Sequence, residues 1–263
     1  WCIDPKLVEA AITPKTRAIL CVHLYGNLCE LNELVKICQK FNISLIEDSA
    51  EAFGSKYFNK HVGTFGSFGV FSFHGSKTIS TGEGGMLVTN DRKIYEKSKI
   101  LNNHGINRNF DKQYCPSELG YKFKITNIQA AMGLAQIERS KEIIQKKVKI
   151  MEFYKDYFYN HKDISFNIEP YGYKNSFWMP TAIFSSFCKV SITSLISKFQ
   201  VNNIDARSFF CPLSSLKVFK ENKKNKISRD IYNRAINLPS FYDMNENQLL
   251  KVCKIIEKTI AKK

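Results

Sequence analysis

The sequence lacks any long apolar run. No stretch of its 263 residues approaches the ~20 apolar residues that a membrane-spanning helix needs, so we expect no membrane partner. A secretory leader is missing as well, because Trp1 to Asp4 form neither a basic leader segment nor a start at methionine. This opening predicts a chain that begins inside a domain.

Paired cysteines are also absent. The eight cysteines form no Cys-x-x-Cys pair, and no ligand set has the spacing of a zinc site. Several of them lie within apolar runs, which is typical of buried free thiols in a reducing compartment. We therefore expect a cytoplasmic protein without a metal site.

Acidic residues are scarce beside basic ones, 24 against 39, which gives a formal net charge of +15. Nucleic-acid binding is one interpretation of this excess, and the densest basic cluster runs from Lys220 to Arg229. No RNA-binding signature or array of basic and aromatic residues accompanies the cluster. We favour a solvated lysine-rich surface with no nucleic-acid partner, which would also attract anionic nucleotide sugars.

What the sequence does contain is the apolar content of a globular protein, 44% hydrophobic and 13% aromatic residues. The apolar runs at 17–22 and 43–46 predict buried strands, and helical spacing of apolar residues over 31–41 predicts a helix between them. A strand, a helix and a strand with short connections form a parallel crossover. This arrangement puts His23 and Asp48 at the same edge of a sheet.

Other patterns predict the rest of the chain. A long helix is expected from Asn127, because Ile137, Ile144, Met151 and Phe158 would share one of its faces. A helix of that length commonly bridges two domains, so we expect a large domain over 1–150 and a smaller one over 151–263. Further strands are expected at 68–73, 86–89 and 177–184, helices at 6–11, 91–102, 191–199 and 246–260, and a polar loop at 104–117.

Two stretches carry candidate chemistry. The strand ending at Phe73 runs into a turn of small residues and glycines that holds a single lysine, Lys77. Sheltered by aromatic residues, this amine is a candidate nucleophile, although a solvent-facing lysine in a hairpin loop fits the pattern as well. Asp48 ends an apolar strand, where ligands bind in open parallel sheets, but it could also be a helix N-cap.

The two stretches together, from Glu47 to Ala52 and from Phe71 to Met86, resemble the sugar aminotransferases of the DegT/DnrJ/EryC1/StrS family. Val22 to Gly26 and Val62 to Gly66 extend the resemblance. It implies a pyridoxal 5′-phosphate enzyme of the α/β aspartate-aminotransferase fold, fold type I. The large domain would hold a mostly parallel sheet, and a smaller α/β domain would follow it.

By this resemblance Lys77 forms the covalent bond with the cofactor aldehyde and moves a proton during catalysis. Relatives that dehydrate the sugar carry histidine at the lysine position, so Lys77 favours transamination. Asp48 would pair with the pyridine nitrogen, Glu51 would contact the ring's 3-oxygen, Ala50 would pack on one ring face, and Ser72 would bind the phosphate. His74 and His23 are expected to be packing or turn residues.

Two further residues are assigned by resemblance alone. Lys122 stands where relatives have an asparagine that reaches across the dimer to the cofactor phosphate, and Lys124 replaces an arginine. Arg207 matches an arginine at the substrate side of the site, although an exposed loop arginine is the default. Relatives also have a Ser-Gly-Thr phosphate-binding turn upstream, which does not precede His23 here, so the cofactor cradle is expected to be incomplete at its N-terminal side.

The wording around Lys77 is most similar to the 4-aminotransferases of the family. The expected reaction moves an amino group from an amino acid, glutamate by analogy, to a nucleotide-linked 4-keto-6-deoxysugar, in a homodimer. Two alternatives stay open. One is a 3-aminotransferase or another sugar-modifying enzyme on the same scaffold, and the other is a truncated homologue that no longer holds cofactor and acts only as a binding or partner subunit.

Overall fold

The computed structural model describes residues 1–107, 112, 114–219 and 225–260. Part of the expected polar loop at 104–117 and the start of the basic cluster, 220–224, lie outside the described residues. The chain divides into two compact units. We call residues 2–141 and 171–175 the N-terminal unit, and Trp1, 142–170 and 176 onward the C-terminal unit. The two units are defined by contacts within the structure, and the division into domains at 1–150 and 151–263 stays a prediction.

The N-terminal unit is built on a four-stranded sheet in the order β1-β2-β5-β6. β1 and β2 are parallel, β2 and β5 are parallel, and β6 is antiparallel to β5. The sheet is therefore mixed but mostly parallel, and the expected parallel crossover is present. Its strands are β1 (Ala18–Val22), β2 (Ser44–Asp48), β5 (Phe68–Ser72) and β6 (Gly85–Val88).

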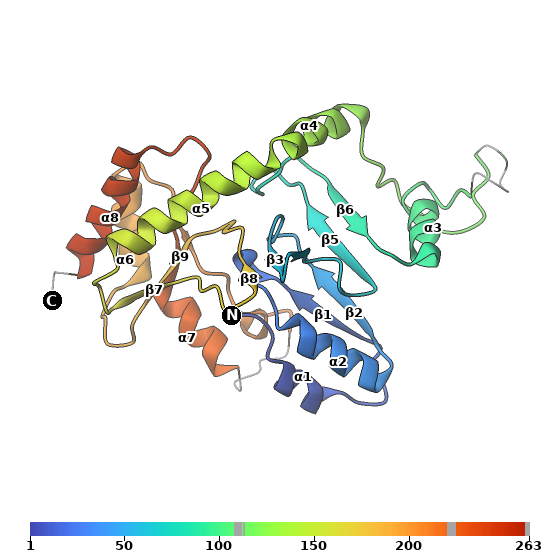
Figure 1. Cartoon of the computed structure of the whole chain (residues 1–263), viewed down its shortest axis with the longest axis horizontal. Coiled ribbons are helices and arrows are strands. Elements are labelled where there is room, and N and C mark those ends of the chain that lie inside the picture. The colour runs from blue at the N-terminus through green and yellow to red at the C-terminus, as the bar shows by residue number, and fades with distance from the viewer. Residues whose placement is uncertain (108–111, 113, 220–224, 261–263) are drawn as a thin grey trace. The chain divides into compact units, whose positions relative to one another are not determined.

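Helices α1 (Pro5–Ala11) and α2 (Leu31–Phe41) lie on one side of β1 and β2 (Figure 1). Buried residues on α2 recur at helical spacing and pack in one cluster with buried residues of β1 and β2. The helix ends at Asn42, whose φ of 50° is the left-handed conformation that terminates a helix. This packing fixes where both strands end, and those ends carry the candidate site.

Two more helices and a small sheet complete the N-terminal unit. Helix α3 (Arg92–Leu101) is capped by Asp91, and α4 (Asn127–Glu138) by Thr126, whose side chain and Gln129 form a reciprocal capping box. A one-turn 3₁₀ helix, η1, spans Leu24–Gly26. The small sheet has the order β4-β3-β8, with β3 (Lys56–Tyr57), β4 (Lys60–His61) and β8 (Tyr173–Lys174).

The single long helix expected from Asn127 is wrong in one respect. Arg139 lies outside helical geometry, so α4 ends at Glu138 and a separate helix, α5 (Ser140–Tyr157), begins after it. The proposed apolar face is split accordingly. Ile137 on α4 is exposed, whereas Met151 on α5 is fully buried in the C-terminal unit. A seven-residue spacing continued across the break, although the two helices bury different faces.

The C-terminal unit packs helices against an antiparallel sheet of order β10-β11-β9-β7. Its core joins buried residues of α5, α6, α8, β9 and β11. Within the described residues, no helix is long and apolar enough to span a membrane. Its elements, besides α5, are β7 (Ile164–Phe166), β9 (Thr181–Phe184), α6 (Ile192–Val201), β10 (Arg207–Ser208), η2 (Leu213–Ser215), α7 (Lys226–Arg234), β11 (Ala235–Asn237) and α8 (Glu246–Ile260).

One lysine of this unit is held inside it. The ammonium of Lys147 on α5 donates hydrogen bonds to the hydroxyl and the carbonyl oxygen of Ser240, and to the carbonyl oxygen of Trp178. Burial lowers the pKa of Lys147 to about 8, because removal from water disfavours the charged form. The ammonium therefore joins α5 to two loops of the unit at a cost in solvation.

We expect this burial to make stability depend on pH. The unfolded chain keeps the Lys147 proton up to about 10.5, whereas the folded protein releases it near pH 8, so the free energy of unfolding should rise with pH between these values. Urea unfolding on either side of that window measures the rise. Lys147→Met should remove it, and Lys149→Met, at an exposed position of the same helix, should keep it. An equal rise in all three proteins would contradict the assignment.

Candidate functional site

The candidate site begins where two parallel strands end. Asp48, the last residue of β2, pairs with Val22 of β1 on one side and with Val70 of β5 on the other. Two residues beyond Val70, β5 ends at Ser72 and the chain enters the turn that carries Lys77. Parallel strands bring their carboxyl ends to one edge of the sheet, so β2 and β5 deliver their last side chains to the same region.

Lys77 and Glu51 form an ion pair at this edge. The Nζ atom of Lys77 lies 3.4 Å from Oε1 of Glu51. The two side chains are only 15% and 10% exposed, so the amine is not the solvent-facing loop lysine that the sequence left open. The other Glu51 oxygen, Oε2, accepts the backbone N–H of Tyr25 at 2.9 Å.

The pKa of the Glu51 carboxyl is shifted by burial and by the charges of Asp48 and Lys77. Burial raises its pKa above the ordinary value, and the charge of Asp48 adds to this rise. The Tyr25 N–H and the Lys77 amine oppose the rise without cancelling it. A carboxyl of raised pKa that lies 3.4 Å from an amine is placed for the proton transfer that general acid–base chemistry uses.

Asp48 has one oxygen committed and one left over. Its Oδ1 accepts the backbone N–H of Ala50 at 3.0 Å. No helix follows it directly, so the alternative role as a helix N-cap is wrong. Within the described residues, no hydrogen bond joins the protein to Oδ2 of Asp48. A protonated ring nitrogen is a suitable partner for this oxygen, and the small side chain of Ala50 leaves room beside it.

The turn around Lys77 is closed at its base by backbone hydrogen bonds. The N–H of Phe73 donates to the carbonyl oxygen of Gly84, and the N–H of Thr81 donates to that of Phe73. Ser72, half-buried at the end of β5, accepts the N–H of His74 through its hydroxyl oxygen at 3.3 Å. His74 itself is exposed, which fits the turn role expected for it.

A buried carboxylate that the sequence did not single out organises the neighbouring loop. Glu47 accepts the backbone N–H groups of Gly63, Phe65 and Gly66 at 2.6–2.7 Å. Burial alone would raise its pKa, but hydrogen bonds from His23, Gly66 and Gly63 outweigh that effect and hold the pKa below its ordinary value. Glu47 and Asp48 have different surroundings because successive side chains of β2 point to opposite faces of the sheet.

His23 belongs to this network and not to the Lys77 side. It is fully buried, its Nδ1 accepts the N–H of Cys29, and its Nε2 lies 3.2 Å from Glu47. Because Nδ1 is an acceptor, the ring hydrogen is on Nε2 and is donated to the carboxylate. The packing role expected for His23 therefore fits its surroundings.

Helix α4 contacts the lysine turn through side chains that the sequence also left unremarked. Gln136 hydrogen bonds with the backbone of Ser80, and Gln129 donates to the carbonyl oxygen of Glu83. These amides are seven residues apart, two helical turns, which is the signal that could have placed them on one face.

Lys122 and Arg207 are not part of this cluster of contacts. Lys122 is exposed, and its backbone pairs with Asn103. Arg207 belongs to the C-terminal unit, is exposed, and has Asp205 3.4 Å from its guanidinium. Both assignments stay predictions.

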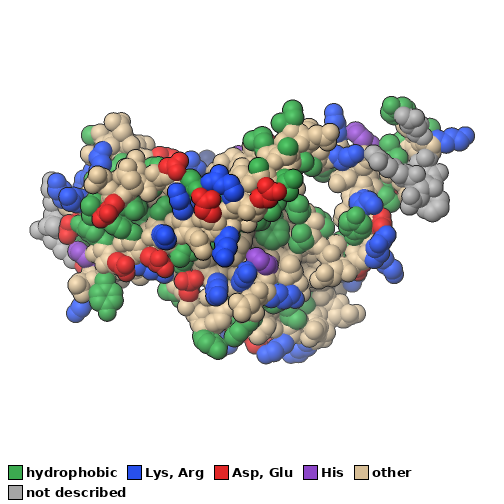
Figure 2. Space-filling view, turned by 45° about the horizontal axis from the view of Figure 1, so that its top comes forward, with side chains coloured by type: hydrophobic (Ala, Val, Ile, Leu, Met, Phe, Trp, Pro, Cys, Tyr) green, Lys and Arg blue, Asp and Glu red, His purple; other side chains and the backbone are tan. Residues whose placement is uncertain are grey.

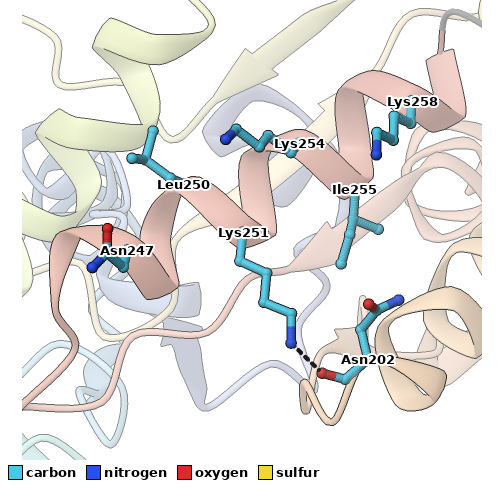
Figure 3. A pocket seen from close by; sticks show the side chains of 7 residues that line it. All are labelled: Asn202, Asn247, Leu250, Lys251, Lys254, Ile255 and Lys258. Atoms are coloured by element: carbon cyan, nitrogen blue, oxygen red, sulfur yellow. Dashed lines mark hydrogen bonds between the residues drawn. The ribbon is translucent and has the colours of Figure 1, made fainter.

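A hollow of about 310 Å³ on the C-terminal unit holds none of the predicted site residues. It lies between α8 and the end of α6, where Lys251 donates to the carbonyl oxygen of Asn202 (Figure 3). Three lysines of α8 line it. On the face of the molecule in Figure 2, Lys and Arg side chains are spread over many separate points. Among the described residues, no group of three or more His, Cys, Asp or Glu could hold a metal ion.

Comparison with known proteins identifies relatives over nearly the whole chain. A model of the DegT/DnrJ/EryC1/StrS aminotransferase family matches residues 1–257. GDP-perosamine synthase of Escherichia coli O157:H7 is 36% identical over 272 residues, which cover 100% of this chain and 71% of that protein. The Vibrio cholerae protein of the same name is 35% identical over 253 residues, 95% of this chain and 68% of that protein.

A solved structure agrees with these relatives. PseC of Helicobacter pylori, an aminotransferase involved in the biosynthesis of pseudoaminic acid, superimposes with a TM-score of 0.89 at 27% identity. The match covers 99% of this chain and 71% of PseC. The expected α/β fold of type I is confirmed by this likeness.

The Glu47 network yields a stability prediction. Glu47→Gln replaces a buried acceptor by an amide whose NH₂ faces N–H groups, so we expect a loss of about 3 kcal/mol in the free energy of unfolding. Because the pKa of Glu47 is lowered in the folded protein, this contribution is present above pH 4.5 and disappears as the pH falls through the folded value. Urea unfolding measures it.

The control for this variant is Glu33→Gln, at an exposed surface ion pair with Lys36. Its expected cost is within about 0.5 kcal/mol. A Glu47→Gln protein as stable as the control would show that the carboxylate does not hold the loop.

Proposed function

The chain belongs to the DegT/DnrJ/EryC1/StrS aminotransferase family, and from that premise we propose that it aminates a nucleotide-linked 4-keto-6-deoxysugar. It is a pyridoxal 5′-phosphate-dependent sugar aminotransferase. The observation that supports a working site most directly is the shielded pair of Lys77 and Glu51, 3.4 Å apart at the carboxyl ends of β2 and β5. Free cysteines, including five that are buried, are consistent with a cytoplasmic protein.

The residues of this edge fit the cofactor chemically. When bound, pyridoxal phosphate supplies an electron sink that stabilises negative charge on the carbon losing its proton. Lys77 would hold it covalently, and the free oxygen of Asp48 would bind its ring nitrogen and keep that nitrogen protonated. Glu51 would lie at the ring's 3-oxygen, Ala50 against a ring face, and the Ser72 hydroxyl at the phosphate.

Lys77 and Glu51 would then manage the protons. A lysine must lose a proton before its nitrogen can attack a carbonyl carbon, and Oε1 of Glu51, 3.4 Å from that nitrogen, would accept it. The Tyr25 N–H fixes the carboxyl through Oε2, so Oε1 stays directed at the amine. With the cofactor bound to substrate, Lys77 would be released and would serve as the base that moves a proton at the reacting centre.

The substrate is proposed from the relatives. Those that are 35–36% identical carry the name GDP-perosamine synthase, which supports a GDP-linked sugar and a perosamine synthase-like reaction. The 4-keto group and glutamate as the amino donor are proposed from the family resemblance. A relative at 29% identity is a transaminase for a UDP-linked sugar. Arg207 is proposed as a contact of the anionic substrate.

An assay with GDP- and UDP-linked 4-keto and 3-keto sugars tests this choice. We expect amination of the GDP-linked 4-keto sugar with glutamate consumed, followed by NMR of the carbon that gains nitrogen. Amination at C3 would favour the 3-aminotransferase alternative. A protein that neither holds pyridoxal phosphate nor aminates any of these sugars would favour the partner-subunit alternative.

Lys77→Ala should abolish covalent attachment of pyridoxal phosphate, because it removes the amine that lies beside Glu51 at this edge. Borohydride reduction followed by peptide mass spectrometry identifies the attached residue. Lys36→Ala, at an exposed lysine of α2, is the matched control and should leave attachment unchanged. Undiminished attachment in Lys77→Ala would remove Lys77 from the mechanism.

We also propose a homodimer that supplies Lys122 to the neighbouring site. Helix α4 and the segment before it carry exposed apolar side chains, whereas a solvated surface rarely gathers so many. These are Phe123, Ile128, Met132, Leu134 and Ile137. Lys122 lies beside the first of them, so a second copy seated there would meet it.

Ile128→Glu combined with Leu134→Glu should convert the protein to a monomer by light scattering, because charge would be buried in the interface. The same variant should bind pyridoxal phosphate more weakly, since a partner's Lys122 would be lost. Phe187→Glu, at an 85% exposed site of the C-terminal unit, should change neither result. A wild-type monomer with full cofactor affinity would refute the dimer.

A further inference from the structure

Gln136 of α4 uses both ends of its amide on one residue of the lysine turn. Its Nε2 donates to the carbonyl oxygen of Ser80 at 2.5 Å, and its Oε1 accepts the N–H of Ser80 at 3.1 Å. Two hydrogen bonds to one backbone position fix both the place and the orientation of that position, as two-pronged contacts do. Ser80 follows Lys77 by three residues.

Two further contacts hold the same helix face against the turn. Gln129 donates from Nε2 to the carbonyl oxygen of Glu83 at 2.8 Å. A Cβ atom on Gly133 would lie 3.0 Å from Cγ2 of Thr81, so the absence of a side chain at Gly133 permits the close approach. Positions 129, 133 and 136 share one face of a helix.

The contacts from α4 restrict the backbone of the turn that carries Lys77. Its base is closed by the backbone bonds between Phe73, Thr81 and Gly84, but Gly82 and Gly84 have φ of +78° and +151° and are conformationally permissive. A turn rich in permissive residues does not by itself hold a lysine backbone in one place. The contact from Gln136 is made at Ser80, which lies along the chain between Lys77 and Thr81 of this base.

The contact is unlike one made for stability alone. A helix that docks to stabilise a fold buries its apolar side. On α4 only Gly133 is buried, the amides face the turn, and apolar residues such as Ile128 and Leu134 are exposed. The face of α4 that contacts the turn therefore binds it mainly through side-chain amide hydrogen bonds, and not through buried apolar side chains.

We propose that Gln136 is a positioning residue for Lys77, with Gln129 and Gly133 as its support. The inference rests on the proposed function, because it assigns to Gln136 the placement of the amine that attaches pyridoxal phosphate. The rate of a reaction between bound groups depends steeply on their relative positions, so a shift of the turn by about 1 Å should slow attachment of the cofactor. Gln136 binds the backbone of Ser80 and would act on Lys77 through that backbone.

The experiment compares cofactor attachment in wild type, Gln136→Met and Gln136→Glu. Methionine keeps the length and helix preference of glutamine but makes neither hydrogen bond. Glutamate keeps the acceptor for the Ser80 N–H and loses the donor to its carbonyl oxygen. The cofactor-free proteins are mixed with pyridoxal phosphate, and covalent attachment is followed by visible absorbance over time and across pH.

We expect Gln136→Met to attach the cofactor about tenfold more slowly than wild type and to shift the pH midpoint of the absorbance change. Gln136→Glu should be intermediate, because one of the two bonds remains. Gln145→Met, at an exposed glutamine of α5, should match wild type in both measurements. A purely structural role would lower the melting temperature of Gln136→Met without moving the pH midpoint.

The outcomes separate this inference from the proposed function. Attachment to Lys77 in wild type, with the same rate and pH midpoint in Gln136→Met, would overturn the positioning role and leave the proposed function standing. No attachment to Lys77 in wild type would overturn both. If Gln136→Met does not fold, the comparison of Gln136→Glu with Gln145→Met decides in the same way.

Discussion

The pairing of the Lys77 amine with the Glu51 carboxyl, largely shielded from water, is the interaction on which the site depends. Such a pair is a poor device for stability, because the cost of removing two charges from water offsets their attraction. Burial and the charge of Asp48 raise the pKa of the Glu51 carboxyl above its ordinary value, and perturbed pKa values of this kind cluster at functional sites. The rest of the N-terminal unit brings these two groups to one edge of a sheet.

Two neighbouring carboxylates at the end of β2, the buried Glu47 and the partly buried Asp48, face opposite sides of the sheet. Glu47 faces away from the amine, gathers three backbone N–H groups of the 63–66 loop and receives His23. Its neighbour Asp48 points to the other face and keeps one oxygen free. A single acidic pair at the end of β2 thus serves both architecture and chemistry, because successive strand residues face opposite ways.

Much of this could be predicted from the sequence, for local reasons. The strands ending at Val22, Asp48 and Ser72 are short apolar runs bounded by polar or small residues, and parallel pairing follows from the helix between the first two. Lys77, Asp48 and Glu51 were recognisable because a family pattern surrounds them. The roles of Lys122 and Arg207 could not be derived in this way, because each depends on surfaces that lie beyond its own local segment.

Other features escaped the sequence because they are contacts between distant segments. Gln136 binds the backbone of Ser80, 56 positions away, and nothing in the local pattern of α4 announces that target. The break at Arg139 was hidden because the apolar spacing continued across it, although the helices on either side bury their residues in different units.

The most direct test of the central claim is a crystal structure of the protein with pyridoxal phosphate bound. The account predicts a covalent bond from the cofactor to Nζ of Lys77 and an Asp48 oxygen within about 3 Å of the pyridine nitrogen, the distance of a hydrogen bond. A cofactor attached elsewhere, or a ring nitrogen out of reach of Asp48, would contradict it.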